Sequence, residues 1–258
     1  MLSRMPQSLA DVLHIYQGRR VLVTGASGFL GRWVARLLHE SGAELFLAAR
    51  FAGTPRSAGE AYQFAGRVIV ADFRDAGAFS QIYREAQPEV TFHLAGYGVD
   101  PEERDAARAD RLNHNLIEEI ANAIGAERAA GWPGLRLIHA GSAAEYGAVP
   151  GPVTEKTPEN PVNLYGRTKL AGKWALRRAV EHSGVRAVTA RLFTVYGPGE
   201  HAHRLLPSLI EAAQAGRTLG LTAGEQQRDF TYVADVAEGL LRLEIGKASC
   251  RERVCVPV

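Results

Sequence analysis

The chain is poor in cysteine and has no long apolar run. Its 258 residues include two cysteines, Cys250 and Cys255, both near the C-terminal end. They form no C-x-x-C pair, no metal-binding spacing and no disulfide framework, so we expect neither a metal site nor a cross-linked scaffold. No stretch is long enough to span a membrane, and residues 1–18 have no sustained apolar core of the signal-peptide kind. These absences predict a cytoplasmic protein with no membrane partner.

The chain also has no large excess of one charge. Lysine and arginine total 30 and the acidic residues 28, a formal net charge of +2, and the basic residues form no long run. This pattern gives no reason to expect a nucleic-acid partner. Hydrophobic residues, in contrast, make up 46% of the chain. That share is enough for the core of one large α/β domain.

The most informative stretch is residues 21–31, where an apolar run leads into three glycines. Gly25, Gly28 and Gly31 have the spacing G-x-x-G-x-x-G, and a helical pattern begins among them. Glycine allows a tight turn and lets a phosphate approach the main chain, while a helix N-terminus offers free N–H groups and a positive dipole end. The stretch therefore predicts a pyrophosphate-binding turn, although an ordinary structural turn can give the same pattern.

The rest of the chain alternates short apolar runs with helical patterns, after an irregular or partly helical start over residues 1–18. A Gly/Pro/Ser-rich loop is expected over residues 53–59. The alternation predicts an α/β fold, a Rossmann-type doubly wound parallel sheet with helices on both faces. Expected strands cover residues 20–24, 44–49, 67–71, 90–95, 135–140 and 187–192, and expected helices cover 29–40, 76–86, 102–130, 165–182, 204–215 and 233–245.

Three residues form a candidate catalytic set. Tyr165 and Lys169 are four residues apart, so on a helix they share one face. A phenol has a pKa of about 10, and a nearby ammonium lowers that pKa, which fits the phenol for proton transfer near neutral pH. Ser142 follows the fifth expected strand, where its hydroxyl could donate to a carbonyl oxygen. Taken singly, each of the three could be an ordinary surface or turn residue.

Together these motifs resemble the extended short-chain dehydrogenases/reductases, in the NAD(P)-dependent epimerase/dehydratase family that acts on nucleotide sugars. The matching pieces appear in the family's order and span residues 20–245. They are residues 24–31, Asp72, residues 92–96 and 141–147, the Tyr165-x-x-x-Lys169 pair, and residues 191–199 and 228–233.

The resemblance implies roles for matching positions. Tyr165 would be the acid–base group, Lys169 would bind the nicotinamide ribose and lower the pKa of the tyrosine, and Ser142 would hold the reacting oxygen. Asn113 matches a family asparagine near the active site, although a helix-surface asparagine is the alternative. The residues expected to bind the cofactor are Gly25, Ser27, Gly28, Phe29, Leu30, Gly31, Arg50, Asp72, Phe73, Leu94, Ala95, Gly96, Tyr97, Asn113, Tyr165, Lys169, Phe193 and Val195.

A nucleotide-sugar substrate is implied in the same way. Asp72 would contact adenine, whereas Arg228 would meet the phosphates of the sugar nucleotide. Thr194 stands where the family usually has an asparagine, so its shorter side chain puts the expected sugar pose in doubt. The residues expected to bind the substrate are Tyr97, Ser142, Tyr165, Thr194 and Arg228.

The end of the second expected strand bears on the cofactor. An NAD enzyme of this type has a carboxylate there for the ribose 2′-hydroxyl. Here the position is Ala49, and Arg50 follows. A guanidinium suits a 2′-phosphate, which favours NADP(H). NAD(H) is the alternative, with Arg50 pointing to solvent.

The residues after Ser142 bear on the reaction. Dehydratases of the family carry acidic residues there, but this chain has Ala143 and Ala144, with Glu145 displaced along the chain. Family members that invert carbons beside a ketone use cysteine and histidine bases. The core here lacks cysteine, and His201 and His203 fit ordinary loop residues. The leading hypothesis is NADPH-dependent reduction of a nucleotide-diphosphate 4-keto-6-deoxysugar at C4. An NAD-dependent 4-epimerase is the alternative, and a non-catalytic NADP-binding regulator is a third.

We expect one NAD(P)-binding Rossmann domain over residues 1–258, with substrate-lobe elements in about 193–246. Residues 247–258 do not resemble the family, whose members usually continue further. We expect a truncation, a frame change or a non-native tail there, which would leave the substrate lobe small and partial. By the same resemblance, the helices over residues 102–130 and 165–182 would form a homodimer interface.

Overall fold

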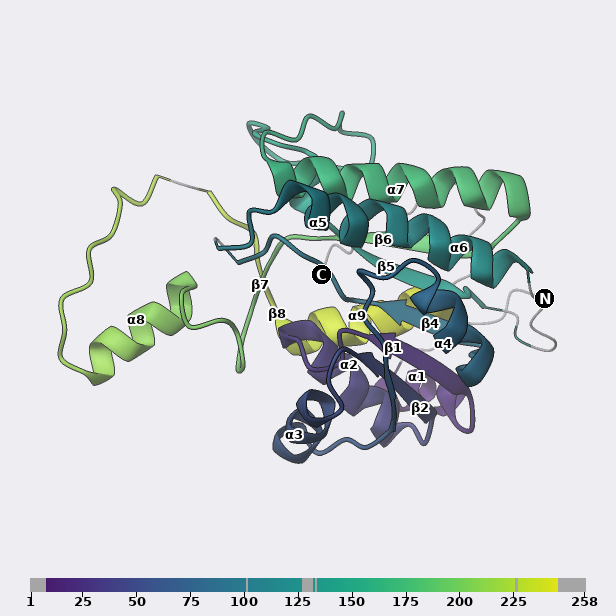
Figure 1. Cartoon of the computed structure of the whole chain (residues 1–258). Coiled ribbons are helices and arrows are strands. Elements are labelled where there is room, and N and C mark those ends of the chain that lie inside the picture. Colours follow the sequence, from purple (N-terminus) through teal and green to yellow (C-terminus); the bar gives the residue numbers. More distant parts are fainter. Residues whose placement is uncertain (1–7, 101, 127–131, 133, 226, 246–258) are drawn as a thin grey trace.

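Six parallel strands form the sheet at the centre of the fold (Figure 1). The strand order is β3-β2-β1-β4-β5-β6, so the order reverses between β1 and β4. The predicted parallel Rossmann-type sheet is confirmed, and its crevice opens at the carboxyl ends of those two strands. The strands are β1 (Arg20–Thr24), β2 (Glu44–Ala49), β3 (Arg67–Val70), β4 (Val90–His93), β5 (Leu137–Ser142) and β6 (Ala187–Leu192).

The computed structural model describes residues 8–100, 102–126, 132, 134–225 and 227–245. The expected helix end at residues 127–130 and the tail at 247–258 lie outside the described residues. The helices are α1 (Leu9–Tyr16), α2 (Phe29–Glu40), α3 (Gly53–Tyr62), α4 (Ala78–Ala86), α5 (Ala106–Asp110), α6 (Leu116–Ala126), α7 (Leu164–Ser183), α8 (Leu205–Gln214) and α9 (Val233–Ile245).

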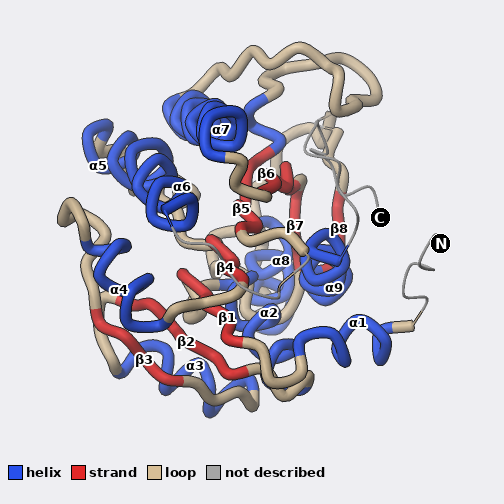
Figure 2. The backbone as a smooth tube through the Cα atoms, turned by 90° about the vertical axis from the view of Figure 1, so that its right-hand side faces the viewer, coloured by secondary structure: helices blue, strands red, loops and turns tan. Residues whose placement is uncertain are grey.

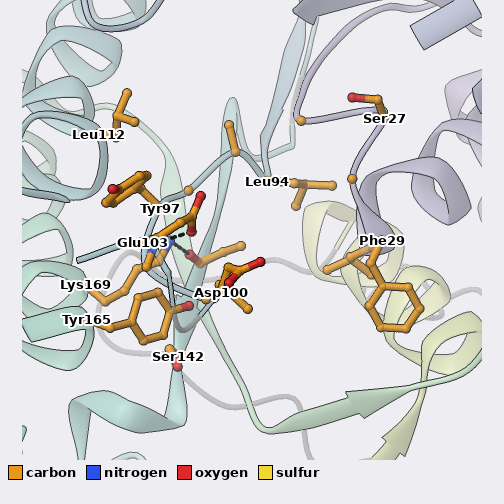
Figure 3. A pocket seen from close by; sticks show the side chains of 18 of the residues that line it. Ser27, Phe29, Leu94, Tyr97, Asp100, Glu103, Leu112, Ser142, Tyr165 and Lys169 are labelled. Carbon is orange, nitrogen blue, oxygen red and sulfur yellow. Dashed lines mark hydrogen bonds between the residues drawn. The ribbon is translucent and has the colours of Figure 1, made fainter. Parts of the chain in front are cut away.

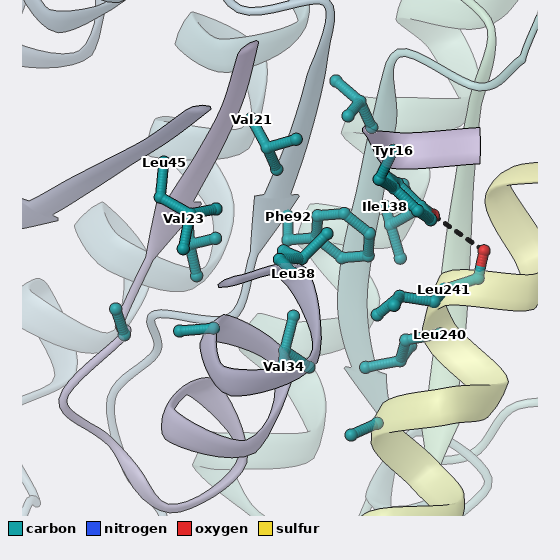
Figure 4. Close-up of a cluster of buried hydrophobic side chains, with 14 of the residues drawn as sticks. Tyr16, Val21, Val23, Val34, Leu38, Leu45, Phe92, Ile138, Leu240 and Leu241 are labelled. Carbon is teal, nitrogen blue, oxygen red and sulfur yellow. Dashed lines mark hydrogen bonds between the residues drawn. The ribbon is translucent and has the colours of Figure 1, made fainter. Parts of the chain in front are cut away.

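Helices cover both faces of the sheet, as Figure 2 shows. Successive residues of a strand point to opposite faces, so β1 supplies both cores. Val21 and Val23 pack with α1, α2 and α9, whereas Leu22 packs with α4, α6 and α7. Figure 4 shows the first of these cores, where the Tyr16 hydroxyl donates to the Leu241 carbonyl at 2.7 Å. This bond ties the first described helix to the last.

The structure corrects the loop expected over residues 53–59, which belongs to α3. Pro55 lies in the first turn of that helix, where its missing N–H leaves no intrahelical bond unmade. Gly59 is buried, and a Cβ there would lie 2.4 Å from the Phe64 carbonyl oxygen. The proline and glycine that indicated a loop therefore serve the start and the packing of a helix.

The long helix expected over residues 102–130 is divided. α5 begins after Asp105, whose carboxylate accepts a main-chain N–H of the first turn at 3.0 Å. A π-helical turn, Arg111–Asn115, then separates α5 from α6. A Cβ on Gly172 of α7 would lie only 2.0 Å from the Asn113 carbonyl oxygen, so α7 packs tightly on this turn. Periodicity alone does not reveal such a turn.

A second, two-stranded parallel sheet consists of β7 (Thr194–Tyr196) and β8 (Phe230–Tyr232). The sequence analysis did not predict these strands. α8 lies between them in the chain and projects from the main body in Figure 1. Among the described residues, no helix is both long and apolar enough to cross a membrane.

Candidate active site

The glycine turn between β1 and α2 is shaped by close main-chain contacts. Gly25 has φ +74°, and a Cβ there would lie 2.8 Å from the Ala95 nitrogen. A Cβ on Gly31 would lie 2.0 Å from the Gly25 carbonyl oxygen, so α2 sits directly against the turn. Gly28 caps α2 without a side chain. The first N–H groups of α2 are thus presented to the crevice, as a pyrophosphate site requires.

A cavity of about 1000 Å³ runs from this turn along the strand ends to α7 (Figure 3). Of the predicted site residues, Gly31, Asn113, Thr194 and Arg228 are not part of its lining. The other predicted residues all line it. They are Gly25, Ser27, Gly28, Phe29, Leu30, Arg50, Asp72, Phe73, Leu94, Ala95, Gly96, Tyr97, Ser142, Tyr165, Lys169, Phe193 and Val195.

Ser142, Tyr165 and Lys169 meet at one end of the cavity. Ser142 is the last residue of β5 rather than a residue after it, and it forms a hydrogen bond with Tyr165. α7 begins after Asn163, whose side chain accepts the Gly166 N–H at 2.8 Å, so Tyr165 lies in the first turn. Lys169, one turn later, is buried and donates to the Ala140 carbonyl at 3.1 Å.

The charge states of this set differ from the expectation. Burial raises the pKa of Tyr165 to about 12, and the Ser142 hydrogen bond offsets this only in part. Burial also lowers the pKa of Lys169 to about 8, against the opposing charge of Glu145. The expected lowering of the tyrosine pKa is therefore wrong for the free protein, because the loss of solvent outweighs the nearby charges. At neutral pH the phenol is protonated.

Glu145 supports Ser142 from behind the cavity. Its carboxylate accepts the Ser142 N–H at 2.8 Å and the Arg191 Nε–H at 2.9 Å. Both side chains of that ion pair are 0% exposed. Arg191 also pairs with Glu159, which binds Lys173 of α7. Glu145 is thus held in a buried network, and it does not line the cavity.

Two buried histidines lie beneath Lys169. His93 and His139 stack with ring centroids 5.8 Å apart. Burial, together with the charge of Lys169, lowers the pKa of His93 to about 3 and that of His139 well below its usual value. Thr24 Oγ1 lies 2.8 Å from His93 Nδ1, and Thr189 Oγ1 lies 3.2 Å from His139 Nδ1. Both rings are neutral at physiological pH and add no charge beside the ammonium.

Asn113 has a supporting place. It is 1% exposed, so it is not the helix-surface residue of the alternative interpretation. Its side chain accepts the Tyr97 N–H at 3.0 Å and donates to the Tyr97 carbonyl at 2.8 Å. It also donates to Thr168 Oγ1 at 3.0 Å. Asn113 therefore fixes the cavity wall at Tyr97 from the layer behind it.

The predicted substrate residues Thr194 and Arg228 lie elsewhere. Thr194 begins β7, and its N–H donates to the Asp229 carbonyl at 3.0 Å. Arg228 is exposed and precedes β8. The two strands thus hold these residues next to the cavity-lining Phe193 and Val195 without placing them in its wall.

The opposite end of the cavity carries two guanidinium groups. Arg50 lines it beside Phe51, and Arg74 binds the Asp72 carboxylate with Nε 2.8 Å from Oδ2. The hydrogen bond from Arg74 lowers the pKa of Asp72 to about 2, and the charge of Arg50 contributes to this lowering. Sequence reasoning missed Arg74, although it lies only two residues after the predicted Asp72.

Other lining residues were also missed. Asp100, Glu102, Glu103 and Arg108 follow β4, and Glu200, His201 and Arg204 precede α8. His201 lines the cavity and His203 does not. Neither loop contains a motif that indicates a binding site. Only the folded chain brings the loop after β4 and the loop before α8 to the same cavity.

The residues present fit a dinucleotide and a hydride-transfer reaction. Closely packed glycines at a helix N-terminus suit the pyrophosphate, and the buried Lys169 beside Tyr165 suits a ribose next to a proton donor. With the strand order of the sheet, these features define an NAD(P)-dependent enzyme of the extended short-chain dehydrogenase/reductase class.

The chain belongs to the NAD dependent epimerase/dehydratase family, whose model matches residues 21–244. It is 30% identical over 245 residues to dTDP-6-deoxy-L-talose 4-dehydrogenase (NAD(P)(+)) of Kitasatospora kifunensis, covering 93% of this chain and 72% of that protein.

Two solved structures share the fold. MoeE5 in complex with UDP-glucose and NAD has a TM-score of 0.72 at 28% identity, covering 91% of this chain and 73% of that one. UDP-glucuronic acid 4-epimerase of Bacillus cereus, in complex with UDP-glucuronic acid and NAD, has a TM-score of 0.72 at 26% identity, covering 85% and 71%.

Proposed function

We propose that the protein reduces a nucleotide-diphosphate 4-keto-6-deoxysugar at C4 with NADPH. The observation that carries this proposal is the protonated Tyr165 phenol, hydrogen-bonded to Ser142 in the cavity that also contains the glycine turn. A reduction needs a proton donor at the reacting oxygen, and a phenol with a raised pKa stays in the donating form.

In this mechanism the bound cofactor supplies the hydride. Ser142 Oγ donates a hydrogen bond to the C4 carbonyl oxygen and holds it beside Tyr165. Tyr165 transfers its hydroxyl proton to that oxygen as C4 becomes tetrahedral. The resulting phenolate is stabilised by the ammonium of Lys169, one helical turn away. Asn113 keeps the wall at Tyr97 in place.

Two observations argue against related reactions. A dehydratase needs an acid and a base next to the reacting hydroxyl. Ala143 and Ala144 provide neither, and Glu145 is tied to Arg191 outside the cavity. Inversion beside a ketone needs bases as well, and among the described lining residues His201 is the sole histidine and cysteine is absent.

One relative supports this substrate class. The name of the Kitasatospora protein contains a dTDP-linked 6-deoxysugar, position 4 and NAD(P)+. The similarity to that protein supports a reaction at C4 of a nucleotide-linked deoxysugar for this chain. Arg228 would meet the diphosphate and Thr194 the sugar if the segment of β7, α8 and β8 moves toward the cavity on binding.

The direct test is NADPH oxidation, followed by absorbance, with 4-keto-6-deoxyhexoses linked to each common nucleoside diphosphate. We expect turnover with at least one of them. Tyr165→Phe should lower the rate about 10²–10⁴-fold and leave NADPH binding unchanged. If NADPH is oxidised with none of these nucleotide sugars, the reductase proposal is refuted. If the Tyr165→Phe variant no longer binds NADPH, the assigned role of Tyr165 is refuted.

A nucleotide-sugar 4-epimerase with retained NAD+ is the second candidate. The similarity to the Bacillus cereus 4-epimerase favours it. Denaturing freshly purified protein and identifying the released dinucleotide separates the two, because an epimerase of this kind releases tightly bound NAD+. A non-catalytic NADP-binding protein, the third candidate, would bind NADPH and turn over neither substrate.

The preference for NADPH is assigned to Arg50, at the end of β2 where no carboxylate stands. Replacing Arg50 by alanine should weaken NADPH binding about tenfold and leave NADH binding nearly unchanged, because only the 2′-phosphate is lost as a partner. Arg56→Ala, on the exposed side of α3 and outside the cavity lining, is the matched control. Equal losses for both cofactors would refute the assignment.

The same proposal includes a homodimer and a cytoplasmic location. The outer side of α7 carries Trp174, 37% exposed, with the Lys173 and Arg177 cations over its ring. An aromatic side chain of this kind is typical of an interface. A monomer mass by light scattering would reject the dimer, and cell fractionation tests the location.

A further inference from the structure

The cavity carries carboxylates that the proposed mechanism does not use. Asp100, Glu102 and Glu103 come from the loop after β4, and Glu200 comes from the loop before α8. These side chains lie in the lining shared with Ser142, Tyr165 and Lys169. They therefore border the volume that a sugar must enter to reach the phenol.

A chain of contacts places Glu103 near the reacting groups. The Gly98 main chain packs on the Tyr165 ring, since a Cβ on Gly98 would lie 3.2 Å from Tyr165 Cδ2. Glu103 Oε2 accepts the Gly98 N–H at 2.6 Å. The negative charge of Glu103 contributes to the raised pKa of Tyr165. Figure 3 shows Glu103 on the side of the cavity where Tyr165 and Lys169 lie.

The cations nearby compensate this charge only in part. Arg204, whose charge lowers the pKa of Tyr165, pairs with Glu200 at 3.4 Å. Arg108 is exposed, and its guanidinium carbon lies 5.5 Å from the centre of the Tyr97 ring. With Glu200 and Arg204 paired, the three carboxylates after β4 outnumber the two other cations of this part of the lining, Lys169 and Arg108.

We propose that Glu103 is a sugar-binding residue that selects nucleotide sugars whose hexose carries no carboxylate. A carboxylate accepts more than one hydrogen bond, so Glu103 can bind a sugar hydroxyl while it holds Gly98. A uronate carboxylate in the same volume meets like charge and is repelled. The proposal rests on the proposed function in one respect, that the reacting carbon lies at Tyr165.

The test compares two ligands that differ only at C6. UDP-glucose and UDP-glucuronate are titrated calorimetrically into the protein in the presence of NADP+, and the dTDP-linked pair is titrated in the same way. For the nucleotide, UDP or dTDP, whose sugars bind the protein, we expect the glucuronate to bind about tenfold more weakly than the glucose. A uronate that binds as tightly as the neutral sugar, or no binding on either base, overturns the proposal.

Glu103→Gln isolates the charge, because glutamine keeps the shape and an acceptor for Gly98. We expect this variant to bring the two affinities to within about threefold of each other. Glu40→Gln, which alters a surface ion pair of α2 outside the cavity lining, should keep the full difference. An unchanged preference in the Glu103 variant, with an unchanged melting temperature, overturns the proposal.

The outcomes for the two proposals are separate. A preference for the neutral sugar without NADPH oxidation of any 4-keto sugar rejects the reductase and keeps the selectivity. NADPH oxidation without that preference rejects the selectivity and keeps the reductase.

Discussion

At the scale of single residues, the buried carboxylate of Glu145 contributes to the pKa values of the proposed catalytic groups, in addition to the larger effect of burial. Its negative charge raises the pKa of both Tyr165 and Lys169. It also fixes the Ser142 N–H, so one side chain influences all three members of the set. A Cβ on Gly141 would lie 2.7 Å from Glu145 Oε1, which explains the glycine before Ser142.

Replacing Glu145 by glutamine should therefore move the basic limb of the pH–rate profile to lower pH. Both pKa values fall when the negative charge is removed, and Lys169, whose pKa is about 8, then loses its proton earlier as the pH rises. The expected shift is about one pH unit, measured from NADPH oxidation between pH 6 and pH 10. A variant with a lower rate but an unmoved profile would show that Glu145 acts only through structure.

Glu159→Gln is the matched control for that experiment. Glu159 binds the same Arg191 but does not contact Ser142, and its charge is not among the causes of the raised pKa of Tyr165. Its removal should cost stability and leave the profile in place.

The sequence could bring Ser142, Tyr165 and Lys169 together in one predicted site because few elements are involved, and the structure places all three in the lining of one cavity. Tyr165 and Lys169 share a helix face, and Ser142 ends a strand, so the fold has only to bring two elements together. Glu103 and Arg74 were missed because their partners are set by the loops around them. The direction of the Tyr165 pKa was also missed, because burial is a property of the folded chain.

At the scale of elements, the packing of α7 on the π-helical turn positions the cavity wall. Replacing Gly172 by alanine should push α7 away from Asn113, because the new Cβ would lie 2.0 Å from its carbonyl oxygen. We expect a loss of about 1–3 kcal/mol in the free energy of unfolding, together with weaker cofactor binding. Urea unfolding and NADPH titration measure the two effects.

The matched control is Gly53→Ala at the start of α3. A Cβ there meets nothing within 4 Å, and Gly53 has no positive φ. This variant should unfold at the same or a slightly higher urea concentration, since alanine favours a helix more than glycine does. Equal stability of the Gly172 and Gly53 variants would contradict the packing argument.

The elements that could be predicted from the sequence are those whose hydrophobic pattern corresponds to the residues that are buried in the fold. Each strand of the large sheet is an apolar run, so all six were found, with ends that differ by up to two residues. α3 was missed because its Pro55 and Gly59 are turn formers in most contexts. β7 and β8 were missed because they are three residues long and pair across more than thirty residues of chain.

At the scale of the whole molecule, the central sheet buries two histidines that must stay neutral. His93 lies on β4 and His139 on β5, and each is almost fully shielded from solvent. In an unfolded chain each imidazole titrates near pH 6.5. In the folded protein the pKa of His93 is about 3, and that of His139 is also far below its usual value.

The sign of the resulting pH dependence follows from these pKa values. Between about pH 3 and pH 6.5 the unfolded state binds more protons than the folded state, so stability falls as the pH falls through this range. Above pH 6.5 the two histidines contribute no dependence. Each should cost about 2 kcal/mol of unfolding free energy between pH 6.5 and pH 5.

Urea unfolding at pH 7 and pH 5 tests this for wild type, His139→Leu and His39→Gln. The leucine variant removes one titrating group from the sheet, so its stability should fall less between the two pH values. His39 is exposed on α2, and its variant should keep the wild-type difference. If His139→Leu loses as much stability on acidification as wild type, the buried histidines are not the cause of the acid sensitivity. Its origin would then lie in the carboxylates, whose ion pairs with arginine are lost when they bind protons.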